Sequence, residues 1–291
     1  MLDNWRRVSG LVCVLLSALT ALAPAKDFDL MVDDVSGLDE PWPLVAGLPL
    51  PEGALHDASR IRIVRADGGE VPAQIDVAAT WRDGSIRWAL AGFTASPRGS
   101  YRVAYGPGIS RSQPDTPLTL QEGEDGGMTI NTGVATYEFL PDRLLPQSGR
   151  LRETVFLDGA GDGAYLVDNQ GRVARVAGPH AGVTSDVVKV GPARAVVHRA
   201  GWYVTGDGER VARAKAWFYF AADSPNVRVT HTLVLTENTN EWWIRDYGLQ
   251  FETPRPADEV AFALSNPAPM ESSPYLKNLK AILGKRYEDL G

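Results

Sequence analysis

The sequence predicts an all-β protein, and three observations support that fold class. The 291 residues include 29 glycines and 20 prolines, a composition that favours many turns over long helices. Several segments alternate apolar and polar residues with the period of two that is typical of strands with one buried face. Asp-Gly pairs, which readily form tight hairpin turns, separate some of these segments. The length and the 44% hydrophobic content suffice for two domains with separate cores.

The first 25 residues are typical of a secretory signal. Arg6 and Arg7 precede an apolar run over residues 11–22, and three small residues then suit a cleavage site. The run is shorter than the roughly 20 residues that span a bilayer, and an uncleaved anchor is the alternative. We expect residues 1–25 to be removed, leaving a secreted or periplasmic protein without membrane attachment. The single cysteine, Cys13, would leave with them, so neither disulfides nor thiol chemistry are expected.

Residues 27–110 are predicted to form a first domain of short antiparallel strands. Within it, residues 74–90 read QIDVAATWRDGSIRWAL, in which two alternating segments flank Asp83-Gly84. This pair is predicted to form a type I′ hairpin turn, because both residues tolerate positive φ angles. A second turn at Asp67-Gly68 precedes the hairpin, so consecutive strands are expected to pair as one meander.

Two tryptophans flank the hairpin turn. Trp81 and Trp88 are candidate platforms for a sugar ring. Trp88 follows the same alternation as Ile86 and Leu90, however, which predicts that it belongs to the core of the first domain.

A change in composition separates the two predicted domains. Residues 106–127 contain three prolines, several serines and threonines, and an acidic cluster at residues 122–125. Such a composition is typical of a linker or an exposed loop. We therefore expect a linker over residues 111–127.

Residues 128–265 are predicted to form a second β domain with longer strands. Candidate strands cover residues 128–132, 134–140, 193–204, 211–221 and 227–236, with turns at Thr132-Gly133 and residues 205–209. His231 shares the alternation of four aliphatic residues, which predicts a structural histidine on the core side. His198 receives the same interpretation, because no acidic residue lies near it in sequence to orient its ring.

The glycine-rich segment at residues 158–163 has acidic residues spaced as in a calcium or phosphate loop. A calcium loop counted from Asp158 would need a glutamate at its twelfth position, where the chain has Asn169. A phosphate loop would need a lysine after its last glycine, and Ala164 stands there. We therefore expect no metal site and no cofactor.

The charge balance disfavours nucleic acid as a partner. The net charge is −7, and 27 basic against 35 acidic residues remain once residues 1–25 are removed. The chain has neither a run of lysine and arginine nor an aromatic-basic nucleic-acid motif. Any acidic ligand would need a local basic pocket.

Aromatic residues are dense in the second domain, and their faces can stack on the apolar face of a sugar ring. Consecutive aromatics at residues 202–203 and 217–220 point to opposite faces of a strand, so core packing should take at least half of them. The best candidate for an exposed carbohydrate-binding patch follows a polar turn at residues 236–240. Its members are Trp242, Trp243, Arg245 and Tyr247.

Several stretches of the chain resemble one family. WPLVAGLPLPEG at residues 42–53, SRIRIV at 59–64, VPAQ at 71–74 and WRDGSIRW at 81–88 are similar, in order and spacing, to the N-terminal domain of the exo-rhamnogalacturonan lyase-like (PcRGLX-like) family. GPARAVV at 191–197, PNVRVTHT at 225–232 and IRDYGL at 244–249 resemble its next domain. The resemblance implies a small RIFT-type β barrel, then a central β sandwich, and then an α/α toroid.

The resemblance also implies a polysaccharide lyase that cleaves pectic rhamnogalacturonan by β-elimination. That reaction needs a group that neutralises the uronate carboxylate, a base and an acid. No motif in the β domains matches these roles, so no catalytic residue is assigned. Only 26 residues follow Ser265, and residues 266–291 are expected to be a tail with one helix rather than a toroid.

Three functional hypotheses follow. The first is the secreted, non-catalytic β-domain portion of such a lyase, truncated before its catalytic toroid and acting on or binding pectic or other acidic polysaccharide. The second is an autonomous carbohydrate-binding or scaffolding module that uses the patch at residues 242–247. The third is a small, complete polysaccharide lyase.

Overall fold

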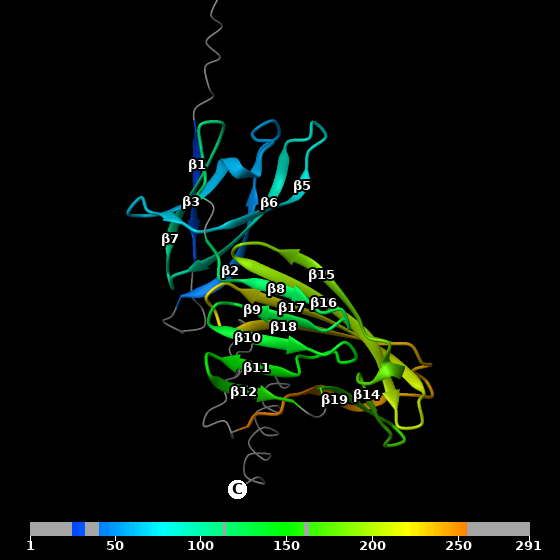
Figure 1. The fold of residues 1–291 in the computed structure, drawn as a ribbon. Coiled ribbons are helices and arrows are strands. Elements are labelled where there is room, and N and C mark those ends of the chain that lie inside the picture. Colours follow the sequence, from blue (N-terminus) through cyan, green and yellow to red (C-terminus); the bar gives the residue numbers. More distant parts are fainter. Residues whose placement is uncertain (1–24, 33–40, 113–114, 160–162, 255–291) are drawn as a thin grey trace, which may run out of the picture.

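The computed structural model describes residues 25–32, 41–112, 115–159 and 163–254 of the chain (Figure 1). Within these residues the only helical pieces are two 3₁₀ turns, η1 (Ala58–Arg60) and η2 (Pro179–Ala181), and all other regular structure is β-strand. The predicted all-β class is confirmed. The tail expected at residues 266–291, and all but the last residue of the expected signal, lie outside the described residues.

The first domain consists of two antiparallel sheets around one hydrophobic core. Its strands are β1 (Lys26–Met31), β2 (Trp42–Pro49), β3 (Ile61–Arg65), β4 (Glu70–Val71), β5 (Gln74–Thr80), β6 (Ile86–Ala95) and β7 (Ser100–Tyr105). One sheet has the order β1-β7-β3-β4 and the other the order β2-β6-β5. Fully buried aliphatic residues of both sheets, including Leu48, Ile63 and Val103, pack together in the core.

The strands between residues 61 and 90 do not form the single meander that the sequence suggests. β3 and β4 pair within the four-stranded sheet, whereas β5 and β6 pair within the other sheet. Val71 ends β4 and Gln74 begins β5. Pro72, between them, has no amide hydrogen with which to continue a ladder. The chain therefore passes from one sheet to the other at the VPAQ stretch.

The hairpin turn at Asp83-Gly84 is not the expected type I′ turn. Gly84 has a φ of 81°, but Asp83 is not among the residues with positive φ. The amide of Gly84 donates to the Trp81 carbonyl (3.1 Å), and the amide of Trp81 donates to the Ser85 carbonyl (2.8 Å). This is a three-residue loop that ends in a left-handed glycine, so only one position needs positive φ.

Replacing Gly84 by alanine is therefore expected to cost about 1 kcal/mol of unfolding free energy, because an L-residue is strained at this φ. A Cβ at this position meets only the His56 ring, at 4.0 Å, so crowding adds little. Urea denaturation of the two proteins measures the difference. A stabilised variant would contradict the expectation, and alanine at the extended Gly47 offers a comparison without positive φ.

Trp88 lies outside the barrel core, which corrects the prediction from alternation. Its side chain is 42% exposed, whereas Ile86 is buried. The pairing of β5 with β6 shifts register near this point, between Val77 and Ala79 and again at Thr80. Such a bulge changes which residues face inward. The Trp88 ring instead covers Gly47 of β2, where a Cβ would lie 3.4 Å from the ring.

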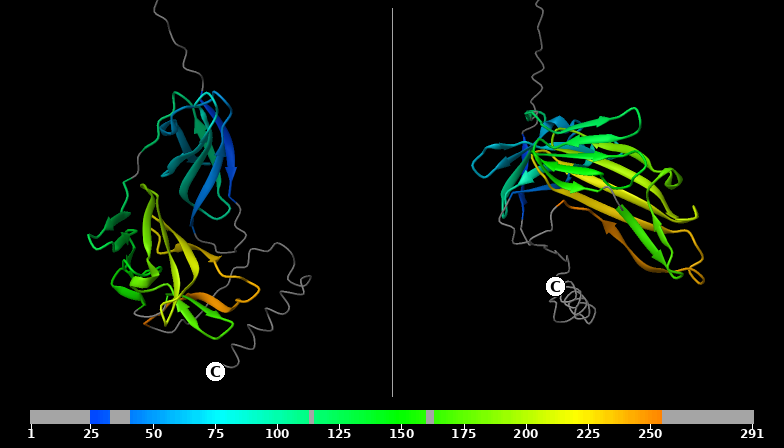
Figure 2. Two further views of the ribbon diagram at one scale, coloured as in Figure 1. Left: turned by 90° about the vertical axis from the view of Figure 1, so that its right-hand side faces the viewer. Right: turned by 60° about the horizontal axis from the view of Figure 1, so that its bottom comes forward.

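The second domain is a sandwich of two antiparallel sheets (Figure 2). The five-stranded sheet, in the order β12-β11-β10-β9-β8, contains β8 (Thr119–Glu122), β9 (Met128–Asn131), β10 (Ala135–Phe139), β11 (Ser148–Leu151) and β12 (Thr154–Asp158). The seven-stranded sheet has the order β18-β17-β16-β14-β13-β19, and β15 also pairs with β16. Its strands are β13 (Gly163–Asp168), β14 (Val173–Arg175), β15 (Thr184–Val190), β16 (Arg194–Thr205), β17 (Arg210–Ala221), β18 (Val227–Leu235) and β19 (Ile244–Gln250).

The sandwich begins inside the segment that composition assigns to a linker. β8 pairs along its length with β9 and forms the edge of the five-stranded sheet. Leu118, just before β8, is buried in the sandwich core. Residues 118–122 therefore belong to the second domain, despite the polar and proline-rich sequence around them.

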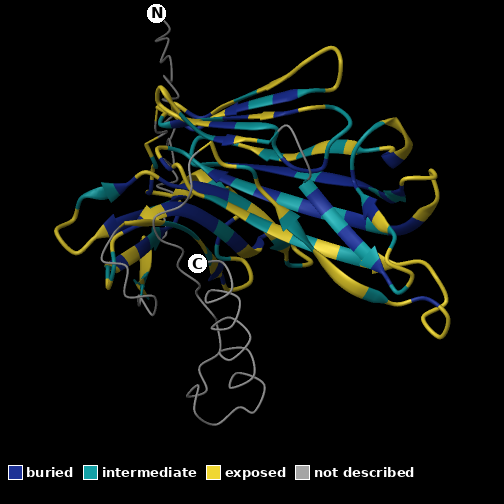
Figure 3. Cartoon of the chain, turned by 90° about the horizontal axis from the view of Figure 1, so that it is seen from below, coloured by how far each residue is buried: buried dark blue, intermediate teal, exposed yellow. Residues whose placement is uncertain are grey.

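The two sheets of the sandwich meet through alternate residues of their strands, and the burial pattern along the long strands shows this period (Figure 3). In β17, Phe218 and Phe220 are buried, while Trp217 and Tyr219 are only half-buried. The Phe218 ring lies 5.0 Å from that of Phe139, and Phe220 lies 5.4 Å from Tyr137, both across the sheet interface. The core thus takes half of the aromatic run, as expected.

Candidate functional site

The carbohydrate-binding patch predicted at residues 242–247 is only partly available to a ligand. Trp242 is 7% exposed and belongs to the sandwich core, so its ring cannot serve as a stacking platform. Its amide and that of Glu241 both donate to the Asn238 carbonyl, in a tight turn just before the ring enters the core. Trp243 is 56% exposed, and Arg245 and Tyr247 are exposed on β19. These three residues stay a predicted contact surface.

A second surface of the sandwich combines aromatic rings with cations. Phe218 and Phe220 point toward the five-stranded sheet, so the alternate residues of β17 point away from it. Strand register places Tyr219 opposite Arg228, and Arg213 opposite Trp202. Hereafter the outer face denotes Trp202, Arg213, Lys215, Trp217, Tyr219 and Arg228, all half-buried or exposed. From Arg213 to Tyr219 this face runs for about 20 Å, at about 7 Å per outward residue.

The charge of the outer face is opposite to that of the whole chain. Strands β15–β18 contain seven lysines and arginines but a single acidic residue, Asp186. Within the part of the chain that the structure describes, no carboxylate lies within ion-pair distance of Arg213, Lys215 or Arg228. These cations are available to an anionic ligand, and they meet the need for a local basic surface on an acidic protein.

Each ring of the outer face has a basic neighbour. The Arg213 guanidinium lies 5.1 Å from the Trp202 ring centroid, and Arg228 lies 5.4 Å from that of Tyr219. The His198 ring packs against Trp217 with centroids 4.5 Å apart. Such contacts hold the rings in place along the sheet and set a guanidinium beside the flat apolar surfaces of Trp202 and Tyr219.

His198 has the acidic partner that the sequence does not reveal. Asp186 of β15 stands opposite it, and Asp186 Oδ2 lies 3.2 Å from His198 Nδ1. The other ring nitrogen, Nε2, is buried. Because Nε2 is buried and Nδ1 is paired with Asp186, His198 is poorly placed to exchange a proton with a ligand. Its ring packs against Trp217 and holds that indole in place.

A buried tyrosine–histidine pair lies between the sheets. Tyr203 Oη is 3.1 Å from His231 Nε2, and Tyr203 is fully buried. Burial raises the pKa of the Tyr203 phenol above its ordinary value and lowers the pKa of the His231 imidazole. The pair resembles an acid–base couple, but a ligand cannot reach Tyr203. His231 lies on the core side of β18, as the alternation indicates.

A cleft of about 580 Å³ opens where the outer face meets the barrel. Trp42, Val45 and Thr94 line it from β2 and β6 of the barrel. Tyr219, Asn226 and Arg228 line it from the sandwich. The cleft therefore continues the outer face at the end nearest the barrel.

A polar contact centred on Asp76 joins the two domains beside this cleft. The Asp76 carboxylate accepts a hydrogen bond from Arg194 Nη2 (2.8 Å), and Lys189 Nζ lies 2.6 Å from its other oxygen. Gln74 Oε1 accepts a hydrogen bond from the backbone amide of Arg194 (3.1 Å). A Cβ on Gly191 would lie 2.4 Å from that same Oε1, so this approach requires glycine. Gln74, Asp76, Lys189 and Arg194 are called the interdomain latch below. The VPAQ and GPARAVV stretches thus meet at the domain interface.

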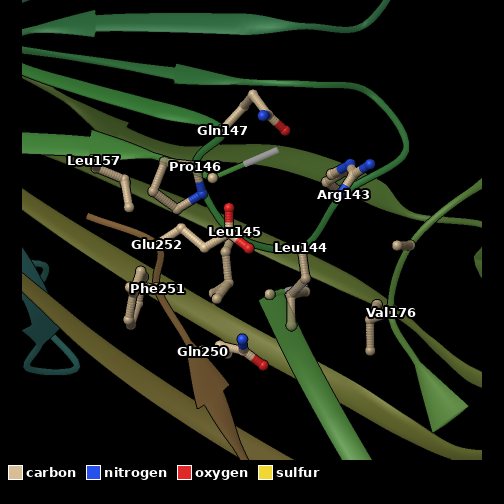
Figure 4. A pocket seen from close by; sticks show the side chains of 13 residues that line it. Arg143, Leu144, Leu145, Pro146, Gln147, Leu157, Val176, Gln250, Phe251 and Glu252 are labelled. Atoms are coloured by element: carbon tan, nitrogen blue, oxygen red, sulfur yellow. The ribbon is translucent and has the colours of Figure 1, made fainter. Parts of the chain in front are cut away.

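Other candidate sites in the described structure are less suited to bind a sugar or a metal ion. A cavity near β13 and β19, lined by Leu144, Leu145, Val176 and Gln250 among others, has a volume of about 20 Å³ (Figure 4). That is room for about one water molecule and not for a sugar. No group of three or more His, Cys, Asp or Glu side chains within the described ranges could hold a metal ion. Residues 160–162 of the glycine-rich loop lie outside those ranges. No helix of the described chain is long and apolar enough to cross a membrane.

The sequence alone does not identify the outer face as a solvent-facing surface. Alternation shows that Arg213, Lys215, Trp217 and Tyr219 share one face of a strand, and this signal was available. It does not show whether that face or the opposite one packs on a second sheet. The neighbours Trp202 and Arg228 come from other strands, which only the pairing register brings alongside.

Two family models match the chain. Residues 39–106 match the PcRGLX-like N-terminal RIFT barrel domain, and residues 169–260 match the PcRGLX-like protein central beta sandwich domain. The five-stranded sheet lies between the two matched ranges. The comparisons with curated proteins and with solved structures found no match.

Proposed function

Because the chain belongs to the PcRGLX-like family, with a RIFT barrel followed by a β sandwich, we propose that its β domains bind pectic or other acidic polysaccharide without catalysing its cleavage. The observation that carries the proposal is the outer face. It presents three aromatic rings, and two of them, Trp202 and Tyr219, lie beside arginines that have no carboxylate partner among the described residues. Rings stack on sugars, and arginine or lysine pairs with uronate carboxylates.

The length of the outer face favours a polymer over a small ligand. Its rings and cations come from the three neighbouring strands β16, β17 and β18, and the face ends at the interdomain cleft. A chain that lies across these strands would meet rings and cations in turn. An autonomous binding module and the binding portion of a larger lyase would use the same surface. The assays below therefore concern binding as such.

Binding is expected to depend on the cations of the outer face. The double variant Arg213→Gln, Lys215→Gln should weaken binding to rhamnogalacturonan about tenfold or more, since a hydrogen bond to a charged group contributes about 1.5–3 kcal/mol. Affinity electrophoresis or calorimetry at fixed ionic strength measures the change. Carboxyl-reduced polysaccharide should bind weakly to both proteins.

Two control variants distinguish binding at the outer face from binding at other surfaces of the protein. Arg102→Gln removes an exposed cation of the barrel that is paired with Asp27 and should leave affinity unchanged. Trp243→Ala tests the patch around β19. If Trp243→Ala abolished binding and the double variant did not, the binding surface would be the patch with Arg245 and Tyr247. A wild-type protein that bound no acidic polysaccharide would refute the proposal.

The absence of catalysis is part of the proposal. Tyr203 is fully buried, and His198 has one ring nitrogen buried and the other paired with Asp186. Purified protein mixed with rhamnogalacturonan is expected to give no rise in the absorbance of unsaturated uronate. A rise that survives Tyr203→Phe would point to a complete lyase that uses other residues.

Secretion is the remaining part of the proposal. It rests on the sequence of residues 1–25, with its basic start, short apolar run and small residues. The mass of the protein recovered from the periplasm or medium of its host should lack these residues. A mature protein that retained Met1 would contradict it.

A further inference from the structure

The interdomain cleft differs from the rest of the outer face in having a second wall. Tyr219 and Arg228 form one side, and the barrel contributes Trp42, which is 47% exposed, together with the exposed Val45. A volume of about 580 Å³ lies within the range of about 300–1,000 Å³ that is typical of small-molecule sites. A ligand in the cleft would meet aromatic side chains from both domains.

Among the described residues, the charges that line the cleft all have one sign. Arg194 and Arg228 are the charged side chains of this described lining, which contains neither Asp nor Glu. Arg194 forms an ion pair with Asp76 in the interdomain latch. Arg228 has no carboxylate partner within the described residues and lies over the Tyr219 ring. In a chain of net charge −7, this leaves one guanidinium without a carboxylate partner among the described residues, in a recess lined mainly by apolar side chains.

The walls of the cleft are held in place by the contacts beneath them. Gly92 of β6 also lines it, and a Cβ there would lie 3.1 Å from Arg194 Cδ. The stem of Arg194 is therefore packed against the barrel while its guanidinium pairs with Asp76. The cleft is a preformed feature of the domain interface, so little ordering entropy would oppose binding.

We propose that this cleft is a subsite for a single carboxylate-bearing sugar ring, with Arg228 binding the carboxylate and Trp42 stacking on the ring. The inference rests on the proposed binding of acidic polysaccharide and deepens it, because it assigns the recognition of one uronate residue to named side chains. The guanidinium supplies two parallel N–H donors for a carboxylate, and the exposed indole supplies an apolar platform. Asn226 and Thr94 line the same space and offer polar groups for hydroxyls.

The test uses a ligand that is small enough to occupy the cleft alone. Methyl galacturonoside and its neutral counterpart, methyl galactoside, are titrated against the full protein by ligand-observed NMR. Wild-type protein should bind the acidic sugar at least about tenfold more tightly than the neutral one. Arg228→Gln should abolish that preference, and Arg228→Lys should restore part of it. Trp42→Ala should weaken both sugars, whereas Trp88→Ala, which removes an equally exposed barrel tryptophan, should weaken neither.

The outcomes separate the two proposals. Polysaccharide binding without any preference for the acidic monosaccharide, or a preference unchanged in Arg228→Gln, would overturn the subsite and leave the outer face intact. Binding of the acidic monosaccharide without polysaccharide binding would overturn the proposed function and leave the subsite. Failure to bind either ligand would overturn both. Circular dichroism of each variant establishes that it is folded.

Discussion

Replacing Arg199 by alanine is expected to lower the free energy of unfolding by about 3–5 kcal/mol. Arg199 of β16 is fully buried between the sheets of the sandwich. Its Nη2 donates to the carbonyls of Leu140 (2.6 Å) and Pro141 (3.3 Å), and its guanidinium lies 5.2 Å from the Phe139 ring centroid. Alanine would leave a cavity and would remove the donor from the Leu140 and Pro141 carbonyls.

Arg199→Ala removes both the volume and the charge of the side chain, so a second variant is needed to separate their effects on stability. Burial lowers the pKa of Arg199 to about 10, which reflects the cost of holding the charge away from water. Arg199→Met removes that cost and keeps most of the volume, so it should destabilise the protein less than alanine does. Urea denaturation compares the three proteins. A loss below about 1 kcal/mol in Arg199→Ala would mean that the loop at Leu140 is not held by this side chain.

Replacing Asp76 by asparagine is expected to loosen the two domains from each other. The substitution leaves Lys189 and Arg194 facing each other without the carboxylate that pairs them. Asp76 is 13% exposed, and the expected loss is about 2–3 kcal/mol, below the range for fully buried pairs because Lys189 is more exposed. Since the domains have separate cores, denaturation of the variant should separate into two transitions.

The same contact predicts a pH dependence. Burial raises the pKa of the Asp76 carboxyl, but hydrogen bonds from Lys189, Arg194 and Gln74 outweigh it, so the pKa lies below the ordinary value. A lowered folded pKa means that the stabilisation is fully present above the unfolded value of about 3.9 and is lost as pH falls through the folded value. Wild-type protein should therefore unfold in one transition at pH 7 and approach the behaviour of Asp76→Asn only below about pH 4.

A matched control is the exposed pair on the barrel. Asp27 pairs with Arg102 at 3.4 Å, and both side chains are at least half exposed. Asp27→Asn should change stability by less than about 1 kcal/mol at any of these pH values. If Asp27→Asn and Asp76→Asn behaved alike, the interdomain latch would not be what holds the domains together.

Much of the fold could be predicted from local sequence. The strands over residues 194–205, 210–221 and 227–235 follow from alternation over many residues, and the structure places them within one or two positions of the prediction. Turns lie at Asp67-Gly68 and Asp83-Gly84 as the Asp-Gly pairs predict, and Gly68 and Gly84 both take positive φ. The turn at Asp83-Gly84 differs from the prediction in its type. These features depend on residues that are near in sequence, so the sequence shows them directly.

The misplaced residues share a physical cause. Trp88 leaves the core because a bulge changes the register of β5 against β6, and alternation within one strand cannot reveal that. Trp242 enters the core because a turn at Asn238 redirects the chain. Asp186 is far from His198 in sequence and reaches it only through strand pairing. Each of these depends on a neighbour from another strand.

The all-β class, the order of barrel and sandwich, and the family follow from alternation, turn chemistry and motif spacing, which are properties of the chain alone. Which aromatic residues face solvent, which cations lie beside them and where the two domains form a cleft depend on the folded arrangement of the strands. Outer-face residues come from different strands, and cleft residues come from different domains. Strand register and domain packing bring them together, and neither is encoded in any single stretch of residues.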